Sequence, residues 1–211
     1  MIELKSSETI TIAVVSDSHV PDRVNSLHPS LIRGLIDLHP DYIFHAGDVS
    51  KRPVLDRLKE IAPVFTVRGN RDFLLAGQLP MQQVFLVNGI KVLLTHGHQN
   101  FLTYWLDKAA NFIQHYQLDR YVIRLQKICP TARVFIFGHT HHAENTWKEK
   151  RLFFNPGSCS AGEPPDFSIS YGVVKFHPDG RMESQLFPLT GAKASFRKWR
   201  MQGKQDAEIS E

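Results

Sequence analysis

The sequence contains few cysteines and no long hydrophobic run, and each scarcity excludes a class of protein. Its 211 residues include only Cys129 and Cys159. A disulfide framework needs more than one pair, so we expect two reduced thiols in a cytoplasmic protein. The longest apolar runs, such as residues 134–137, are far too short to cross a membrane, and the polar N-terminus has no apolar signal segment. A membrane is therefore not expected among the partners.

The sequence also lacks a strong excess of charge of one sign. Its 25 lysines and arginines oppose 21 aspartates and glutamates, which leaves a net charge of +4. Much of the excess falls near the C-terminus, at Lys193, Arg197, Lys198, Arg200 and Lys204. Such a run is usually a solvated end, so nucleic acid is not expected as a partner. We assign residues 1–190 to one domain and residues 191–211 to a basic, polar tail with the composition of a disordered end.

The first third of the chain alternates strands with helices. Short β-branched, apolar runs at residues 10–15, 42–45 and 64–67 predict buried strands. Leucines and valines at helical spacing predict helices at residues 30–38 and 53–61. This alternation favours an α/β fold whose inner sheet is mostly parallel and has helices outside it.

The rest of the chain is dominated by antiparallel signals. Residues 84–87 and 91–95 flank Asn88-Gly89, a strong hairpin signal, and further hairpins are predicted for 146–154 and 172–186. Residues 101–127 are aromatic and predicted to be helical, as one or two helices that belong to the core, overhang a site or form a subunit interface. A four-layer α-β-β-α sandwich of two mixed sheets accommodates the pattern, although periodicity alone fits a three-layer fold equally well.

Polar motifs follow five of the predicted strands. They are Asp17-Ser18-His19, Gly47-Asp48, Gly69-Asn70, His96-Gly97-His98 and Gly138-His139-Thr140-His141. Each alone is an ordinary turn or a surface residue. Because the carboxyl ends of strands in α/β sheets converge on one edge, their joint occurrence favours a common site.

The side chains in these motifs have the chemistry of a metal site. They are imidazoles, carboxylates and an amide without cysteine, a set that suits Mn²⁺, Fe, Zn²⁺, Ni²⁺ or Co²⁺. Seven candidate ligands are too many for one ion and fit two ions that share a carboxylate: Asp17, His19, Asp48, Asn70, His96, His139 and His141. Two ions about 3.5–4 Å apart form the usual clamp for hydrolysis at phosphorus. The sequence thus predicts a binuclear metal-dependent phosphoesterase of a small phosphate ester, with Mn²⁺ as the first choice of metal.

Taken in order, the five motifs resemble those of the calcineurin-like metallophosphoesterase superfamily. Their spacing, the small size and the Asn155-Pro156-Gly157-Ser158 turn most resemble bacterial and archaeal phosphodiesterases of the YfcE type, over about residues 10 to 187. The resemblance implies the four-layer sandwich, and a metal-bound hydroxide that attacks phosphorus in line. It also implies how the ligands are shared: one ion bound by Asp17, His19 and His141, the other by Asn70, His96 and His139, and Asp48 bridging both.

The third motif departs from the family pattern. Many relatives have a histidine after the Gly-Asn pair, whereas this sequence reads Gly69-Asn70-Arg71-Asp72. Arginine stays charged and cannot donate a proton at neutral pH, but its planar fork grips phosphate. We therefore hypothesise that Arg71 is a phosphate clamp and that proton delivery is left to His98, to water or to nothing. The simpler alternative is a solvated loop residue.

Three other functions share this fold. They are a phosphomonoesterase of broad specificity, a nuclease, and a non-catalytic scaffold such as a eukaryotic retromer subunit. The complete set of seven ligands favours an enzyme, and a phosphodiesterase first. The sequence leaves open the physiological substrate, the native metal and whether the chain forms a homo-oligomer.

Overall fold

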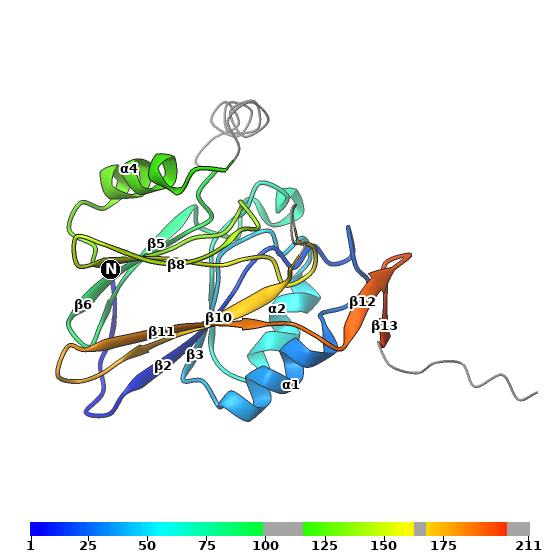
Figure 1. The fold of residues 1–211 in the computed structure, drawn as a ribbon, viewed down its shortest axis with the longest axis horizontal. Coiled ribbons are helices and arrows are strands. Elements are labelled where there is room, and N and C mark those ends of the chain that lie inside the picture. The colour runs from blue at the N-terminus through cyan, green and yellow to red at the C-terminus, as the bar shows by residue number, and fades with distance from the viewer. Residues whose placement is uncertain (99–115, 163–167, 202–211) are drawn as a thin grey trace, which may run out of the picture.

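The computed structural model describes residues 1–98, 116–162 and 168–201, and they form four stacked layers (Figure 1). One outer layer is helix α4 (Leu118–Ile128), and the other consists of helices α1 (Pro29–Leu38) and α2 (Arg52–Lys59). Two mixed β-sheets lie between them. The four-layer prediction is confirmed, and the three-layer alternative is excluded.

The five-stranded sheet has the order β11-β10-β2-β3-β4. Its strands are β2 (Ile10–Val15), β3 (Tyr42–His45), β4 (Val64–Thr66), β10 (Ser170–Phe176) and β11 (Met182–Pro188). Strands β2, β3 and β4 are parallel, as the alternating pattern predicted, and β10 is antiparallel to both β2 and β11.

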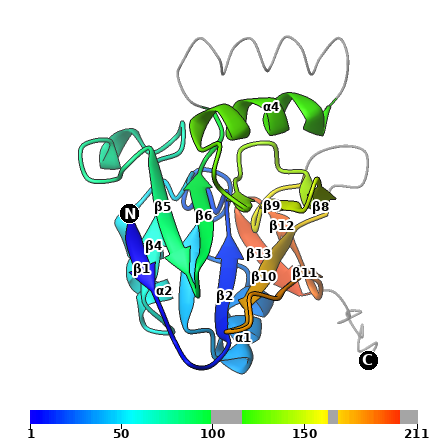
Figure 2. The ribbon, with the colours of Figure 1, turned by 90° about the vertical axis from the view of Figure 1, so that its left-hand side faces the viewer.

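The six-stranded sheet has the order β1-β5-β6-β7-β9-β8. Its strands are β1 (Ile2–Leu4), β5 (Gln82–Val87), β6 (Ile90–Thr95), β7 (Val134–Ile136), β8 (Ala143–Lys148) and β9 (Arg151–Pro156). Strands β6, β7 and β9 are parallel, while β5–β6 and β8–β9 are the predicted hairpins. Strands β1, β5 and β6 lie side by side (Figure 2).

The apolar pattern of each element explains these layers. Alternate residues of both sheets point inward, so Ile12, Phe44, Phe85 and Phe154 meet in a core between the sheets. Helices α1 and α2 bury one face each against the other side of the five-stranded sheet. Helix α4 does the same on the six-stranded sheet, where Tyr121 packs near Phe137.

Residues 192–201, which the sequence assigns to the basic tail, have regular structure. They form a hairpin of β12 (Ala192–Ser195) and β13 (Lys198–Met201). It is fixed to the body through Trp199, whose ring meets His28 edge-on at 4.5 Å and whose Nε1 donates to the Ser26 carbonyl at 2.8 Å. This anchor is a long-range contact that composition could not reveal. Residues 202–211 lie outside the described part.

Other predictions are met only in part. Of the helical segment expected at 101–127, residues 118–127 fall within α4, and residues 101–115 lie outside the described residues. Strand β1 and the short 3-10 helix η1 (Phe73–Leu75) were not predicted. Cys129 and Cys159 are both free thiols. None of the helices described combines the length and apolarity needed to span a membrane.

Candidate metal centre

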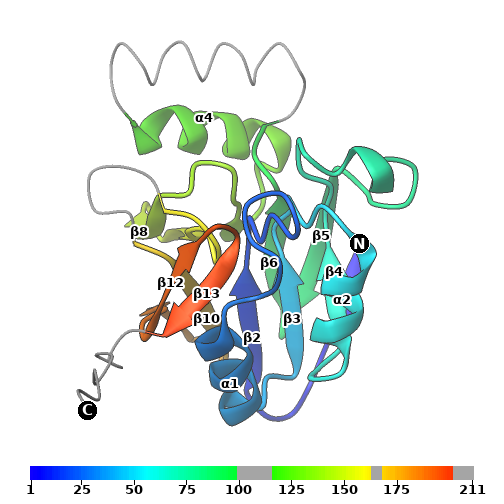
Figure 3. The same ribbon diagram turned by 90° about the vertical axis from the view of Figure 1, so that its right-hand side faces the viewer.

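The five polar motifs meet at one edge of the two sheets. The arrowheads of β2, β3 and β6 point to this edge (Figure 3). Within the five-stranded sheet, the His19 backbone N–H donates to the Asp48 carbonyl at 3.1 Å. Between the sheets, the His139 N–H donates to Asp17 Oδ2 at 3.1 Å, and His96 Nδ1 donates to the Ala46 carbonyl at 2.6 Å. Residues distant in sequence are thereby held in fixed positions.

One group of ligand atoms comes from Asp17, His19 and His141, which are all buried. The Nε2 atoms of the two imidazoles are 3.1 Å apart, and they lie 3.7 Å (His19) and 3.3 Å (His141) from Asp17 Oδ1. Asp17 Oδ1 is buried and accepts no hydrogen bond from the described residues. A buried carboxylate oxygen in that position fits a cation placed between the three side chains.

A second group comes from Asn70, His96 and His139. Asn70 Oδ1 lies 3.0 Å from His96 Nε2 and 2.9 Å from His139 Nδ1. Because His96 donates from Nδ1 to a carbonyl, Nε2 is the ring nitrogen that this residue presents to the group. An amide oxygen and two imidazoles are a suitable donor set for a divalent transition metal.

Asp48 lies between the two groups. Its Oδ2 is 3.9 Å from His19 Nε2, and its Oδ1 is 3.6 Å from His96 Nε2. The two oxygens of one carboxylate therefore face different sets of ligand atoms. Asp48 is thus the one residue of the seven whose two side-chain oxygens approach both groups.

Several of these residues have an unusual backbone. Asp17, His19, Asp48, His139 and His141 all have positive φ angles, between 46° and 72°. The left-handed region is uncommon for residues other than glycine, and such residues cluster at functional sites. The turns after the strands thus aim the side chains into the centre instead of continuing the pleat.

The glycines beside the ligands are needed for close approach. A Cβ added to Gly69 would lie 2.1 Å from Asp48 Oδ1, and one added to Gly138 would lie 2.0 Å from Ser16 Oγ. Both distances are far below van der Waals contact. The Gly-Asn and Gly-His pairs in the sequence therefore reflect a steric requirement of the centre.

Asp72 positions the Asp48 loop, a role that the sequence did not reveal. Its buried carboxylate accepts from the backbone N–H groups of Asp48 at 3.0 Å, Ser50 at 2.7 Å and Gly69 at 2.7 Å. The sequence alone favours a turn cap for an aspartate at this place. Its position two residues after Asn70 was the only available signal.

A further set of polar side chains holds the loops of the centre. Ser158 Oγ and Ser160 Oγ both donate to the Asp17 carbonyl, at 2.9 and 2.8 Å. Asn155 Nδ2 donates to the Gly138 carbonyl at 3.1 Å. The Asn-Pro-Gly-Ser turn noted in the sequence therefore stabilises two ligand loops and contributes no ligand atom to either group.

Burial controls the charge state of the centre. Burial by itself would raise the pKa of Asp17, but attraction to His141, His96 and His19 holds that pKa well below its usual value. Burial raises the pKa of Asp48 to about 6, although attraction to His96 acts against this shift. Repulsion from Asp17 raises the pKa further. Burial also lowers the pKa of His19 to about 3, so this imidazole is neutral and able to bind a metal.

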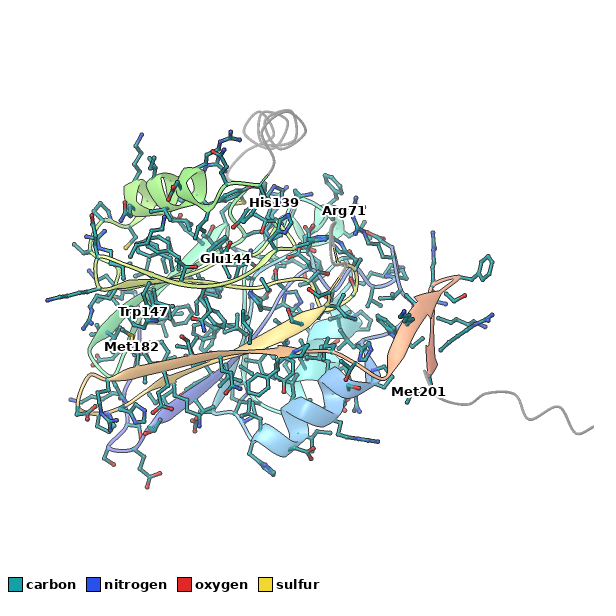
Figure 4. All side chains as sticks on the ribbon, in the orientation of Figure 1. Arg71, His139, Glu144, Trp147, Met182 and Met201 are labelled. Atoms are coloured by element: carbon teal, nitrogen blue, oxygen red, sulfur yellow. The ribbon has the colours of Figure 1, made fainter. Side chains whose placement is uncertain are left out.

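Arg71 and His98 each lie near residues of the candidate centre. The Arg71 backbone N–H donates to Asp48 Oδ1 at 2.7 Å, and its side chain is exposed. Figure 4 labels Arg71 and His139 at the same edge of the fold. The His98 ring lies 5.2 Å from the His96 ring, and burial lowers the pKa of His98 to about 3. His98 is therefore neutral at neutral pH and does not hold the extra proton of an imidazolium acid.

A pocket of about 490 Å³ lies between the loops that follow β2 and β3 and helices α1 and α2. Its wall continues from the metal loops, since Val20 follows His19 in sequence and Lys51 follows the Asp48 loop. The rest of the lining is mainly apolar and includes Leu27 and Ile32. The pocket has room for an organic group of moderate size.

Comparisons with known proteins agree with this geometry. A model of the calcineurin-like phosphoesterase superfamily domain matches residues 10–178. The chain is 30% identical over 181 residues to a probable metallophosphoesterase of Methanocaldococcus jannaschii, an alignment that covers 86% of this chain and 82% of the relative.

Solved structures share the fold. The vacuolar protein sorting 29 structure from Cryptosporidium parvum has a TM-score of 0.65 at 20% identity, covering 87% of this chain and 99% of that one. The zinc complex of Vps29 from Entamoeba histolytica has a TM-score of 0.62 at 20% identity, covering 86% and 100%.

The chain belongs to the calcineurin-like phosphoesterase superfamily. This membership and the candidate ligands support phosphoesterase activity that depends on divalent metal.

Proposed function

We propose that the protein is a binuclear metal-dependent phosphodiesterase. The observation that carries the proposal is the position of Asp48, whose two carboxylate oxygens face two separate groups of ligand atoms. A mononuclear site would not need a second group made of an amide and two imidazoles around Asn70.

In this proposal each side chain has a defined role. Asp17, His19 and His141 would hold one ion, Asn70, His96 and His139 would hold the other, and Asp48 would be the ligand shared by both. Two bound divalent ions would lower the pKa of a water molecule between them and neutralise charge on the phosphoryl oxygens. Because Asp17 and Asp48 offset only part of the charge of two divalent ions, the centre remains attractive to an anionic ester.

Arg71 serves as the phosphate clamp. Its backbone hydrogen bond to Asp48 Oδ1 fixes its Cα beside the bridging ligand, and its exposed side chain is free to reach a substrate oxygen. A guanidinium binds phosphate but does not give up a proton. With His98 neutral, the leaving group takes its proton from water, so esters with good leaving groups react best.

The pocket whose lining includes Val20, the residue after His19, favours a diester over a monoester. A phosphodiester carries two organic groups, and the 490 Å³ pocket offers an apolar wall for one of them. Its Lys51 and Arg57 would restrict this group to one that tolerates nearby positive charge.

Mn²⁺ is our first choice of metal, and zinc is the nearest competitor. The nitrogen and oxygen ligands suit both ions. The Entamoeba histolytica relative of the same fold was solved as a zinc complex, so zinc must be included in any metal screen.

A protein-binding scaffold is the second candidate. Several relatives by fold are Vps29 structures, and one from Chaetomium thermophilum was solved with a cyclic peptide. In this chain Phe73 and Leu74, the first two residues of η1, are each 75% exposed. They directly follow Arg71 and Asp72 in sequence. Exposed apolar side chains of this size suit a protein contact near the candidate centre.

The decisive test measures hydrolysis of bis-p-nitrophenyl phosphate and p-nitrophenyl phosphate by metal-free protein reloaded with Mn²⁺ or Zn²⁺. Asp48→Asn is the test variant. Asp41→Asn is its matched control, because Asp41 also accepts a backbone hydrogen bond, from Thr11, but on the surface. We expect faster diester cleavage that requires metal, is abolished in Asp48→Asn and survives in Asp41→Asn. Faster monoester cleavage would identify a phosphatase, and no cleavage by metal-loaded protein would favour the scaffold.

A further inference from the structure

The C-terminal hairpin concentrates positive charge in a short segment. It contains four of the 25 lysines and arginines and none of the 21 aspartates and glutamates, so its charge equals the net +4 of the whole chain. The four cationic side chains, all exposed, are Lys193, Arg197, Lys198 and Arg200.

The two faces of the hairpin differ completely. In the cross-strand register Ala194 pairs with Trp199, and this face packs on the body through Trp199. Lys193 pairs with Arg200, and Ser195 pairs with Lys198. Because side chains alternate along a strand, these cations share the opposite face and point to solvent.

The cationic face is unfavourable without a partner. Lys193 and Arg200 stand directly opposite each other, and like charges in that position repel. In the part of the chain that the structure describes, no carboxylate forms an ion pair with either of them. An anion placed across the strands would remove this repulsion.

The tip of the hairpin exposes an aromatic ring. Phe196 and Arg197 occupy the turn with φ angles of 47° and 65°, a conformation usually reserved for Asn-Gly. The Phe196 side chain is 92% exposed. A small polar residue at position 196 would make the folded state more stable, so the exposed phenylalanine suits a role in binding.

The tip is connected to the metal loops. The Asn25 backbone N–H donates to the Arg197 carbonyl at 2.7 Å, and in the same loop the Arg23 N–H donates to the His19 carbonyl at 2.8 Å. The hairpin lies at one end of the long axis of the molecule, where Figure 4 labels Met201. The loop that follows β2 therefore links the hairpin tip to the backbone of His19.

We propose that the β12–β13 hairpin binds single-stranded nucleic acid. Lys198 and Arg200 are two residues apart, roughly 7 Å along the strand, and would contact neighbouring phosphates. The exposed Phe196 ring would stack on a base, as in proteins that combine a cationic track with aromatic side chains. This binding does not depend on the proposed phosphodiesterase activity.

The test is fluorescence anisotropy with a labelled single-stranded oligonucleotide, using the full chain in metal-loaded and chelator-treated forms over a range of salt. The hairpin variant combines Lys193→Gln, Lys198→Gln and Arg200→Gln. The matched control removes three exposed cations from β1's end, α4 and the β8–β9 turn: Lys5→Gln, Lys127→Gln and Lys150→Gln. The part of the tryptophan fluorescence that a Trp199→Phe variant lacks reports whether the hairpin still packs on the body, because Trp105 and Trp147 also emit.

We expect the hairpin variant to bind at least about tenfold more weakly at low salt, with a salt dependence reduced by about 2 in log–log slope. The control variant should bind like the parent. Phe196→Ala should lose about fivefold or more in affinity, since stacking contributes per base. Equal losses in both triple variants would overturn the proposal. So would binding to phosphatidylserine vesicles without oligonucleotide binding, or equal competition by polyphosphate with no effect of Phe196→Ala.

Discussion

Replacing Asp72 with asparagine tests whether the buried carboxylate positions the bridging ligand. Asp72 touches no candidate ligand atom, yet its Oδ2 accepts from the Asp48 and Gly69 N–H groups and its Oδ1 accepts from Ser50 N–H. Asparagine has nearly the same shape but one acceptor oxygen. In its best orientation it keeps two of the three hydrogen bonds and turns its NH₂ group toward the Ser50 N–H.

The expected cost follows from this geometry. A hydrogen bond to a charged acceptor contributes about 1.5–3 kcal/mol, and two donors facing each other are unfavourable. Removing a buried negative charge offsets part of this, because Asp72 also raises the pKa of Asp48. We expect the metal-free variant to lose about 2 kcal/mol of unfolding free energy. Since the Asp48 and Gly69 loops loosen, metal affinity should fall about 10- to 100-fold.

Two measurements separate the effects. Urea unfolding of the metal-free protein gives the stability, and competition with a chelating dye gives the metal affinity. Asp41→Asn controls for the same chemical change at the surface, where Asp41 accepts from Thr11 N–H at 2.7 Å. If Asp72→Asn lost stability but bound metal as tightly as the parent and hydrolysed diesters as fast, Asp72 would only fasten a loop and the reasoning would be refuted.

Three further predictions address other parts of the centre. Gly69→Ala should lower kcat/KM about 100-fold, because the new methyl group would displace the bridging carboxylate; parent-like kinetics would contradict the steric requirement. Arg71→Ala should raise KM for a diester about tenfold, and Arg71→Lys should restore part of it; unchanged kinetics on several esters would rule out the clamp. Burial lowers the pKa of His19 and His98 to about 3 and of His45 to about 4, below the value of about 6.5 in an unfolded chain. The unfolded chain then binds more protons at these three groups, so metal-free stability should fall as pH drops from about 6.5 toward 4, by up to ~1.4 kcal/mol per pH unit for each group. Below about pH 6 the raised pKa of Asp48 opposes this fall, but as one group against three; urea unfolding that is flat over this range would contradict these shifts.

The fold was predictable where local pattern and tertiary packing agree. Residues 10–15 and 42–45 are short apolar strands in the sequence and become β2 and β3 with the same limits. Asn88-Gly89 closes the β5–β6 hairpin, with both residues at positive φ. In contrast, β1 has only three residues and pairs with β5, more than 80 positions away, so no local signal marks it.

The gathering of polar side chains at the candidate site was predictable from the sequence, and their support was much less so. Asp17, Asp48 and His139 stand out in the sequence because they come just after apolar strands. The structure brings all seven predicted ligands to one edge. Asp72 is invisible from sequence because its partners are backbone N–H groups of loops whose path depends on the whole fold. In a sequence, an aspartate that accepts hydrogen bonds from three backbone amides cannot be distinguished from an ordinary turn residue.

The β12–β13 hairpin differs from Asp72, because its basic composition was evident in the sequence but its folding into two paired strands was not predicted. The turn lacks the usual glycine or asparagine, so Phe196-Arg197 conceals the hairpin, and the cations read as a solvated run. Local preference and final conformation disagree at this turn, as they do at the positive-φ ligands Asp17, Asp48 and His139. Because such disagreements lower stability, they persist mainly where a function requires them. That correspondence is the physical reason for testing the β12–β13 tip as a binding surface instead of treating it as an end of the chain.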